Sequence, residues 1–330
     1  MTTNQISRRD FLKITALTGG AIAAGVLVRR KLVQPVFTVK ESRIMMGTTV
    51  QLTVVSEDEL KAQLALNSTF SEMSRLIKLF DHRLTGGPIS LLNRNGYLSS
   101  PPKELVDVFA HAYKISELSG GAFDITVKPL VDARFAGLQV NERLLSLVDY
   151  RSVHTSADEI RFRRPDMEVT LDGIAQGTVV DGAVASLKAL GCTNVLVEAG
   201  GELLVNGLPA SGAGWQIGIT HPRPELVAGN LVLFTLTSGA AGTSGDYYQP
   251  LSPDRVEHHV VDPRLGCSPT ELASATVVAP DATSADALAT AVMVMGTKAG
   301  LALINSLESI EALVVTKDLE VKKTMGFPTF

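Results

Sequence analysis

The chain has 330 residues and an apolar share of 45%, which suits one large globular domain or two smaller ones. The first 31 residues hold six of the 30 basic side chains and one of the 34 acidic ones, so the remainder carries a net charge of −9. An acidic body without a basic tract argues against nucleic acid as a partner. Cys192 and Cys267 are the only cysteines. Export would allow a disulfide between them, although Cys192 as a small buried side chain is the simpler interpretation.

The N-terminus carries a twin-arginine signature, Ser7-Arg8-Arg9-Asp10-Phe11-Leu12-Lys13, followed by a mildly apolar run and Arg29-Arg30-Lys31. We interpret residues 1–31 as a twin-arginine export signal and residues 32–330 as one exported domain, periplasmic or otherwise extracytoplasmic. A buried helix with chance arginines is the alternative. No A-x-A cleavage site is evident, so a retained N-terminal membrane tether stays open. Beyond this segment we expect no helix that could span a bilayer.

Hydrophobic periodicity predicts the elements of the first half in chain order. Two early strands come first, then a long amphipathic helix, a loop rich in Gly, Pro and Asn, and a second amphipathic helix. These are expected at residues 36–39, 48–55, 57–79, 81–96 and 103–118. Residues 126–131 lead into an irregular stretch, and residues 145–170 are expected to form short strands with turns.

The second half begins with a helix from near Gly173 to Gly191, followed by a hairpin around Gly200-Gly201. Four strand-like segments are expected at residues 215–220, 231–237, 256–261 and 273–279. A helix over 286–295, capped by Ser284 and ended by Gly296, precedes a helix over 297–307 and a strand over 310–316. Interleaved helices and frequent hairpins favour an α+β fold, with mixed or antiparallel sheets and packed helices. No linker is visible, so we expect one domain.

Two helix starts far apart in the chain suggest one binding site. Asp286 and Thr290 are four residues apart, so they share a helix face and offer hard oxygen ligands to a cation such as Mg²⁺. The segment Gly173-Ile174-Ala175-Gln176-Gly177 offers backbone N–H groups to a phosphate. Together they predict a metal–phosphate site for a nucleotide-like ligand. Each has a plainer interpretation, because small residues ease helix packing and Asp is favoured in a first helical turn.

Three further segments admit a functional and a structural interpretation. His258-His259 could bind a metal, but no third His or Cys lies nearby, and only one of two adjacent strand residues faces a given site. Gly120-Gly121-Ala122-Phe123-Asp124 permits a flat ligand to approach, or simply caps a helix before a core Phe. Thr243-Ser244-Gly245-Asp246-Tyr247 is either a plain turn or a phosphate-contacting loop.

The order of these pieces is more informative than any one of them. Eight segments occur in series, at residues 46–48, 89–93, 121–131, 173–177, 198–202, 243–247, 259–266 and 273–296. This series resembles the ApbE family, the FAD:protein FMN transferases, over about Met46 to Gly296. The resemblance implies the use of Mg²⁺ and of FAD as substrate. It also implies transfer of the FMN moiety to a Thr or Ser hydroxyl of a partner protein, with release of AMP. The acceptor would typically belong to a membrane-associated redox complex.

The resemblance also implies roles for individual residues. Asp286 and Thr290 would bind Mg²⁺ through their side chains, and Gly173 through its backbone carbonyl. His259 would lie near the flavin diphosphate and is the candidate catalytic base. The residues expected to contact FAD are Met46, Arg83, Ala122, Phe123, Asp124, Thr170, Gln176 and His259.

This chain departs from the family pattern at three of these positions. Thr170 stands where the family usually has Asp, and Gln176 where it has Lys; Asp172 could supply the lost carboxylate from two positions away. Arg83 stands where an aromatic residue is common, and could stack on adenine or contact phosphate. These changes motivate two alternatives, an FAD hydrolase that yields FMN and AMP, and a flavin-binding or assembly protein without transferase activity.

Overall fold

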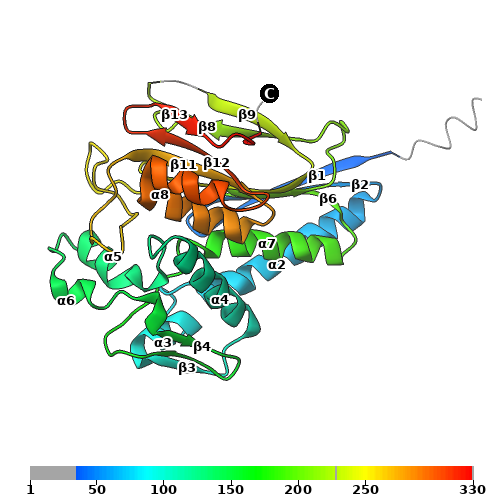
Figure 1. The fold of residues 1–330 in the computed structure, drawn as a ribbon. Helices are drawn as coiled ribbons and strands as arrows, with labels where there is room; N and C mark the ends of the chain where they lie inside the picture. The colour runs from blue at the N-terminus through cyan, green and yellow to red at the C-terminus, as the bar shows by residue number, and fades with distance from the viewer. Residues whose placement is uncertain (1–34, 227–228, 329–330) are drawn as a thin grey trace, which may run out of the picture.

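The computed structural model describes residues 35–226 and 229–328, and an eight-stranded sheet forms its centre (Figure 1). Every pairing in the order β1-β2-β6-β7-β10-β11-β12-β13 is antiparallel. These strands are Phe37–Met45, Thr48–Ser56, Asn194–Ala199, Glu202–Asn206, Ser238–Gly245, Leu272–Ala279, Glu311–Thr316 and Val321–Lys323. The predicted export signal lies outside the described residues.

Helices cover one face of this sheet and a two-stranded ribbon covers the other (Figure 1). The helices are α2 (Glu59–Phe80), α7 (Ala175–Ala189) and α8 (Ala282–Asn305), and the ribbon strands are β8 (Trp215–Thr220) and β9 (Asn230–Leu236). The main apolar core fills the space between helices and sheet, and a second, smaller core joins the ribbon to the other face. The predicted α+β class with antiparallel sheets is confirmed.

A smaller layer lies beyond the helices and is built from short elements (Figure 1). It contains α3 (Pro88–Asn95), α4 (Lys103–Leu118), η1 (Ile125–Val127), α5 (Lys128–Phe135), α6 (Glu142–Leu145), η2 (Tyr150–Ser152), and the sheet of β3 (Tyr97–Ser99), β5 (Glu159–Phe162) and β4 (Val153–Thr155). The prediction of a loop over 81–96 is wrong for α3, because Pro88 in the first turn starts a helix whose Ile89 and Leu92 are buried. The prediction of an irregular stretch after 126–131 is likewise wrong for α5.

Further expectations about local structure are wrong for identifiable reasons. Residues 256–261 form no strand, since their bridge to Pro250 is isolated. Residues 243–245, expected in a turn, end β10, which consists of small residues between β7 and β11. Asp281, not Ser284, caps α8, because its carboxylate accepts the Ser284 N–H at 2.7 Å.

Two other local expectations are confirmed. Gly296 has φ 76° and ψ −179°, so it interrupts the helix, and α8 consists of two helical parts on either side of this kink. Cys192 is a buried free cysteine, and Cys267 is free and exposed.

Helix α8 contradicts the expectation that no helix beyond the N-terminus could cross a membrane. Within the part of the chain that the structure describes, it is the one helix long and apolar enough to do so. Most of its side chains are buried against the sheet, however, so it acts here as the core helix of the domain. Gly242 on β10 permits this packing, because a Cβ there would lie 2.8 Å from the backbone carbon of Ala285.

Asp246, which directly follows β10, is a fully buried carboxylate that ties three segments together. It accepts hydrogen bonds from Arg223 at 2.7 and 2.8 Å and from Lys317 at 2.5 Å. Two cations compensate the cost of burying this charge, and their hydrogen bonds hold its pKa below the ordinary value although burial opposes this. The Asp246 side chain therefore has a structural role, and the Ser244 hydroxyl of the same segment contacts Thr290 of α8.

Candidate active site

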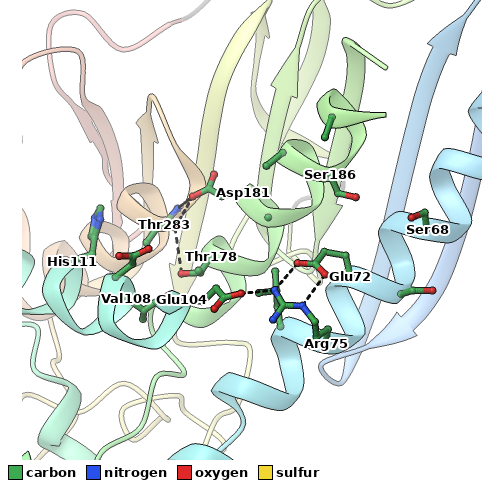
Figure 2. A pocket seen from close by; sticks show the side chains of 16 residues that line it. Ser68, Glu72, Arg75, Glu104, Val108, His111, Thr178, Asp181, Ser186 and Thr283 are labelled. Carbon is green, nitrogen blue, oxygen red and sulfur yellow. Dashed lines mark hydrogen bonds and ion pairs between the residues drawn. The ribbon is translucent and has the colours of Figure 1, made fainter. Parts of the chain in front are cut away.

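The N-terminal ends of α7 and α8 meet at one place and hold each other there. Asp181 of α7 accepts the backbone N–H groups of Ala282 and Thr283 at 2.8 and 2.9 Å, and the Thr283 hydroxyl at 2.5 Å (Figure 2). Its carboxylate thus satisfies free N–H groups in the first turn of α8. The Gly177 N–H of α7 in turn donates to Asp286 Oδ2 of α8 at 2.9 Å. These bonds fix the two predicted ligand-bearing segments relative to each other.

The predicted metal ligands come together from these two helix starts. A Cβ at Gly173 would lie 3.3 Å from Thr290 Oγ1 and 3.3 Å from Phe123 Cε2, so the three residues are in close contact. Thr290 Oγ1 lies 3.1 Å from Ser244 Oγ at the end of β10. Asp286, one turn before Thr290, is only 5% exposed. The arrangement offers carboxylate and hydroxyl oxygens, which suits a hard cation.

The raised pKa of Asp286 also suits a cation site. Burial, together with repulsion by Asp172 and Asp181, raises the pKa of Asp286 to about 7, and the hydrogen bond from Gly177 only partly opposes the rise. Glu202 at the start of β7 is also buried, and burial and the charge of Asp286 raise its pKa well above the ordinary value. A bound cation would relieve the repulsion between these acids. Glu202 was not predicted as a site residue; its one sequence signal is its place after Gly200-Gly201.

The loop between α4 and α5 supplies the apolar side of the site. Ala122 and Phe123 are buried in the main core, and the Phe123 ring edge touches Gly173. The Asp124 carboxylate has partners within the protein: it accepts hydrogen bonds from Thr126 N at 2.8 Å and Thr126 Oγ1 at 2.6 Å, and from Tyr150 N of η2 at 2.9 Å. The Asp124 side chain therefore shapes the loop that presents Phe123.

A strand was expected at His259, but the residue lies in an irregular segment. Burial and the neighbouring His258 lower the pKa of His259 to about 4, so its imidazole is neutral at pH 7. Its Nδ1 atom is buried without a hydrogen-bond partner among the described residues. The Nδ1 atom of His258 also has no partner among the described residues, but its Nε2 lies 3.1 Å from the Pro269 carbonyl and its backbone N–H donates to Ser268 Oγ, so the other ring nitrogen of His258 is engaged within the protein.

Three other predicted flavin contacts have partners within the protein or lie in a turn. The Gln176 amide donates to the Ala199 carbonyl at 2.6 Å and so ties α7 to the end of β6. Thr170 is buried, and its hydroxyl accepts the Asp172 N–H at 3.2 Å. Met46 lies in the turn between β1 and β2 with a φ of 53° and packs against the main core.

Arg83 is held by Asp172. Its guanidinium donates to both carboxylate oxygens of Asp172, at 3.0 and 2.7 Å, and His82 Nε2 lies 3.4 Å from the same carboxylate. Loss of hydration by burial acts to raise the pKa of Asp172. The hydrogen bonds from His82 and Arg83 outweigh this effect and hold the pKa well below its usual range. The Asp172 carboxylate thus stays ionised.

Two cavities flank these residues. One of about 460 Å³ borders the predicted site and is lined by His82, Arg83, Ser90, Asn93, Arg94, Lys128 and Glu168. The other, about 920 Å³, lies between α2, α4 and α7 behind Asp181, and includes the ion pairs of Arg75 with Glu72 and Glu104 (Figure 2). None of the predicted site residues lines this second cavity.

Comparison with known proteins assigns most of the described body to one family. The ApbE family model matches residues 46–314. The chain belongs to the ApbE family. A twin-arginine translocation signal model matches residues 5–25, which indicates export from the cytoplasm.

Relatives and solved structures of the ApbE family extend this result. The chain is 30% identical to a FAD:protein FMN transferase of Vibrio cholerae, over 82% of this chain and 85% of the relative. It is 28% identical to the enzyme of that name from Haemophilus influenzae, over 76% and 79%. The fold is similar to the ApbE protein of Thermotoga maritima, with a TM-score of 0.79, 26% identity, and coverage of 88% of this chain and 98% of that one. It is also similar to the flavinyl transferase ApbE of Pseudomonas stutzeri, with a TM-score of 0.76, 26% identity, and coverage of 90% and 98%.

Proposed function

We propose that this chain is a Mg²⁺-dependent, exported FAD:protein FMN transferase that modifies a Thr or Ser of a partner redox protein and releases AMP. The observation that carries the proposal is the contact of Gly173 with Thr290 and Phe123, one helical turn from the buried Asp286. This places hard oxygen ligands beside an aromatic ring, as a ligand with a diphosphate and a flat ring system requires. The names of the relatives supply the reaction class.

The residues divide the work of the reaction. Mg²⁺, held by Asp286, Thr290 and the Gly173 carbonyl, would neutralise the diphosphate oxygens and assist departure of AMP. The acceptor hydroxyl oxygen forms a bond to the phosphorus of the FMN half, and the bond from that phosphorus to the AMP oxygen breaks. His259 takes the hydroxyl proton at Nε2. The Asp181 and Gly177 hydrogen bonds hold α7 and α8 in place during this exchange.

The test of this function is incubation of the purified chain with FAD, Mg²⁺ and an acceptor protein that carries the Thr site of a flavinylated redox subunit. AMP is measured by chromatography, and flavin on the acceptor by in-gel fluorescence. Both signals together support the transferase. AMP and free FMN in the absence of acceptor would indicate the hydrolase, and tight FAD binding without either product would indicate the binding protein. Two features of this chain motivate the binding-protein alternative. Gln176 is hydrogen-bonded to the Ala199 carbonyl and Arg83 is paired with Asp172, so both side chains already have partners within the protein.

The pH dependence tests the role of His259. The neutral imidazole is the reactive form, and it is lost only as pH falls through a pKa of about 4. At saturating Mg²⁺ and FAD, we expect kcat to stay nearly constant from pH 7.5 to 5.5 and to fall towards pH 4. His259→Gln should lower kcat by about 10²–10⁴-fold and remove this acidic limb. An acidic limb near pH 6.5 in the wild type, or an unchanged profile in His259→Gln, would show that another group accepts the proton.

A further inference from the structure

The ion pair of Arg83 with Asp172 joins two turns that are far apart in the sequence. Arg83 belongs to the turn between α2 and α3, where its own N–H donates to Asp81 Oδ1 at 2.8 Å. Asp172 belongs to the turn before α7 and directly precedes Gly173. Both carboxylate oxygens of Asp172 are engaged by the two terminal guanidinium nitrogens of Arg83, at 3.0 and 2.7 Å. The pair is a bidentate contact, which fixes orientation as well as distance.

The segment that leads to Gly173 does not depend on this pair for its course. Asn93 of α3 bonds both backbone groups of Val169, donating to its carbonyl at 2.9 Å and accepting its N–H at 2.8 Å. The Thr170 N–H donates to the Ile125 carbonyl at 2.9 Å. The side chains of Arg83 and Asp172, by contrast, are 62% and 49% exposed. An ion pair so exposed contributes little to folding stability, so we looked for a role of the pair in ligand binding.

The negative charge of Asp172 indicates what the pair does for ligand binding. Asp172 directly precedes Gly173, so its carboxylate adds a negative charge beside the residues proposed to hold the metal and the diphosphate. Without a cation partner, an ionised Asp172 would repel the anionic diphosphate proposed to bind there. The two N–H groups of Arg83 that face Asp172 are taken up by its carboxylate and cannot also bind the ligand.

We propose that Arg83 is a positioning residue for FAD, which neutralises Asp172 and holds its carboxylate away from the diphosphate. The proposal rests on the proposed FAD site and assigns Arg83 a partner in the protein in place of direct contact with adenine or phosphate. It predicts that Arg83 is needed because Asp172 is present. Removing the acid should therefore remove the need for the cation, which direct contact with FAD would not allow.

A double-mutant cycle tests this dependence. The FAD dissociation constant is measured for the full chain with Mg²⁺ by quenching of flavin fluorescence, beside KM and kcat for AMP release. Arg83→Ala should raise the dissociation constant and KM about tenfold, with a smaller change in kcat. Asp172→Asn alone, and Arg83→Ala together with Asp172→Asn, should both stay within about threefold of the wild type. Thermal unfolding midpoints should stay close to the wild-type value, because the pair is exposed.

Arg94→Ala is the matched control, since Arg94 is an exposed arginine that lines the same 460 Å³ cavity. It should leave FAD binding nearly unchanged, which separates a partner of Asp172 from a general positive field. Equal weakening in Arg83→Ala and in the double variant would overturn the proposal in favour of direct ligand contact. Unchanged binding in Arg83→Ala would also overturn it. Wild-type chain that binds FAD without transferring FMN would refute the proposed function, while the binding cycle would still decide the role of Arg83.

Discussion

Asp286→Asn is expected to abolish FMN transfer, with a fall in rate of about 10³-fold or more. The amide keeps the shape of the side chain and can still accept the Gly177 N–H, but it lacks the negative charge that a divalent cation requires. Mg²⁺ with FAD should raise the unfolding midpoint of the wild type and leave that of Asp286→Asn unchanged, because only a bound ligand stabilises the folded state. Calorimetry and AMP release measured on the same preparations check both statements.

The same substitution should make the metal-free protein more stable above neutral pH. The folded-state pKa of Asp286 is about 7, above its value in an unfolded chain, so stability is lost as pH rises towards and through 7 and the buried group ionises. Asp286→Asn removes this loss, and its unfolding midpoint in EDTA at pH 8 should exceed that of the wild type. Asp281→Asn on the same helix is the control, since it alters only the N-cap and should retain activity. An active Asp286→Asn enzyme would contradict the assignment of this carboxylate.

Gly177→Ala should destabilise the protein by about 3 kcal/mol, although alanine is the better helix former. A Cβ at Gly177 would lie 2.1 Å from the Ala282 carbonyl oxygen and 2.9 Å from the Asp286 Cβ, so α7 and α8 must move apart. That movement also breaks the bond between Gly177 N and Asp286 Oδ2, and FAD affinity should fall with stability. Urea unfolding and FAD titration provide the two measurements.

Gly182→Ala offers a matched comparison within the same helix. Its Cβ would meet the end of the Leu76 side chain at 2.4 Å, and a side-chain terminus can rotate where a backbone carbonyl cannot. We expect a change in unfolding free energy within about 1 kcal/mol and unaltered FAD affinity. Equal losses of unfolding free energy in the two variants would show that Gly177 is not needed for the close packing of α7 on α8.

Local sequence patterns were reliable where a segment had one strong periodicity. The spacing of apolar residues predicted α2 and α4 within two residues, and the hairpin of β6 and β7 around Gly200-Gly201 was also correct. Strand β10 was missed because Ser238–Gly245 has Thr243 as its one β-branched side chain and no aromatic one, and it forms a strand only between β7 and β11, with α8 packed against it. Helix α3 was missed because its flanking glycines and Pro88 resemble a loop until Ile89 and Leu92 find the core.

The sequence by itself determined the export signal, the α+β class, the family, and the identity of Asp286, Thr290, Gly173 and His259 as candidate site residues, since each depends on residue type and order along the chain. The tertiary structure alone decided which partners the other predicted site residues have within the protein, and it added Glu202 to the site. It shows Asp124 bound to Thr126 and Tyr150, Gln176 bound to Ala199, Arg83 bound to Asp172, and Glu202 buried near the charge of Asp286. Hydrogen-bond partners and burial depend on segments about 20 to 110 residues apart, and no local pattern encodes those distances.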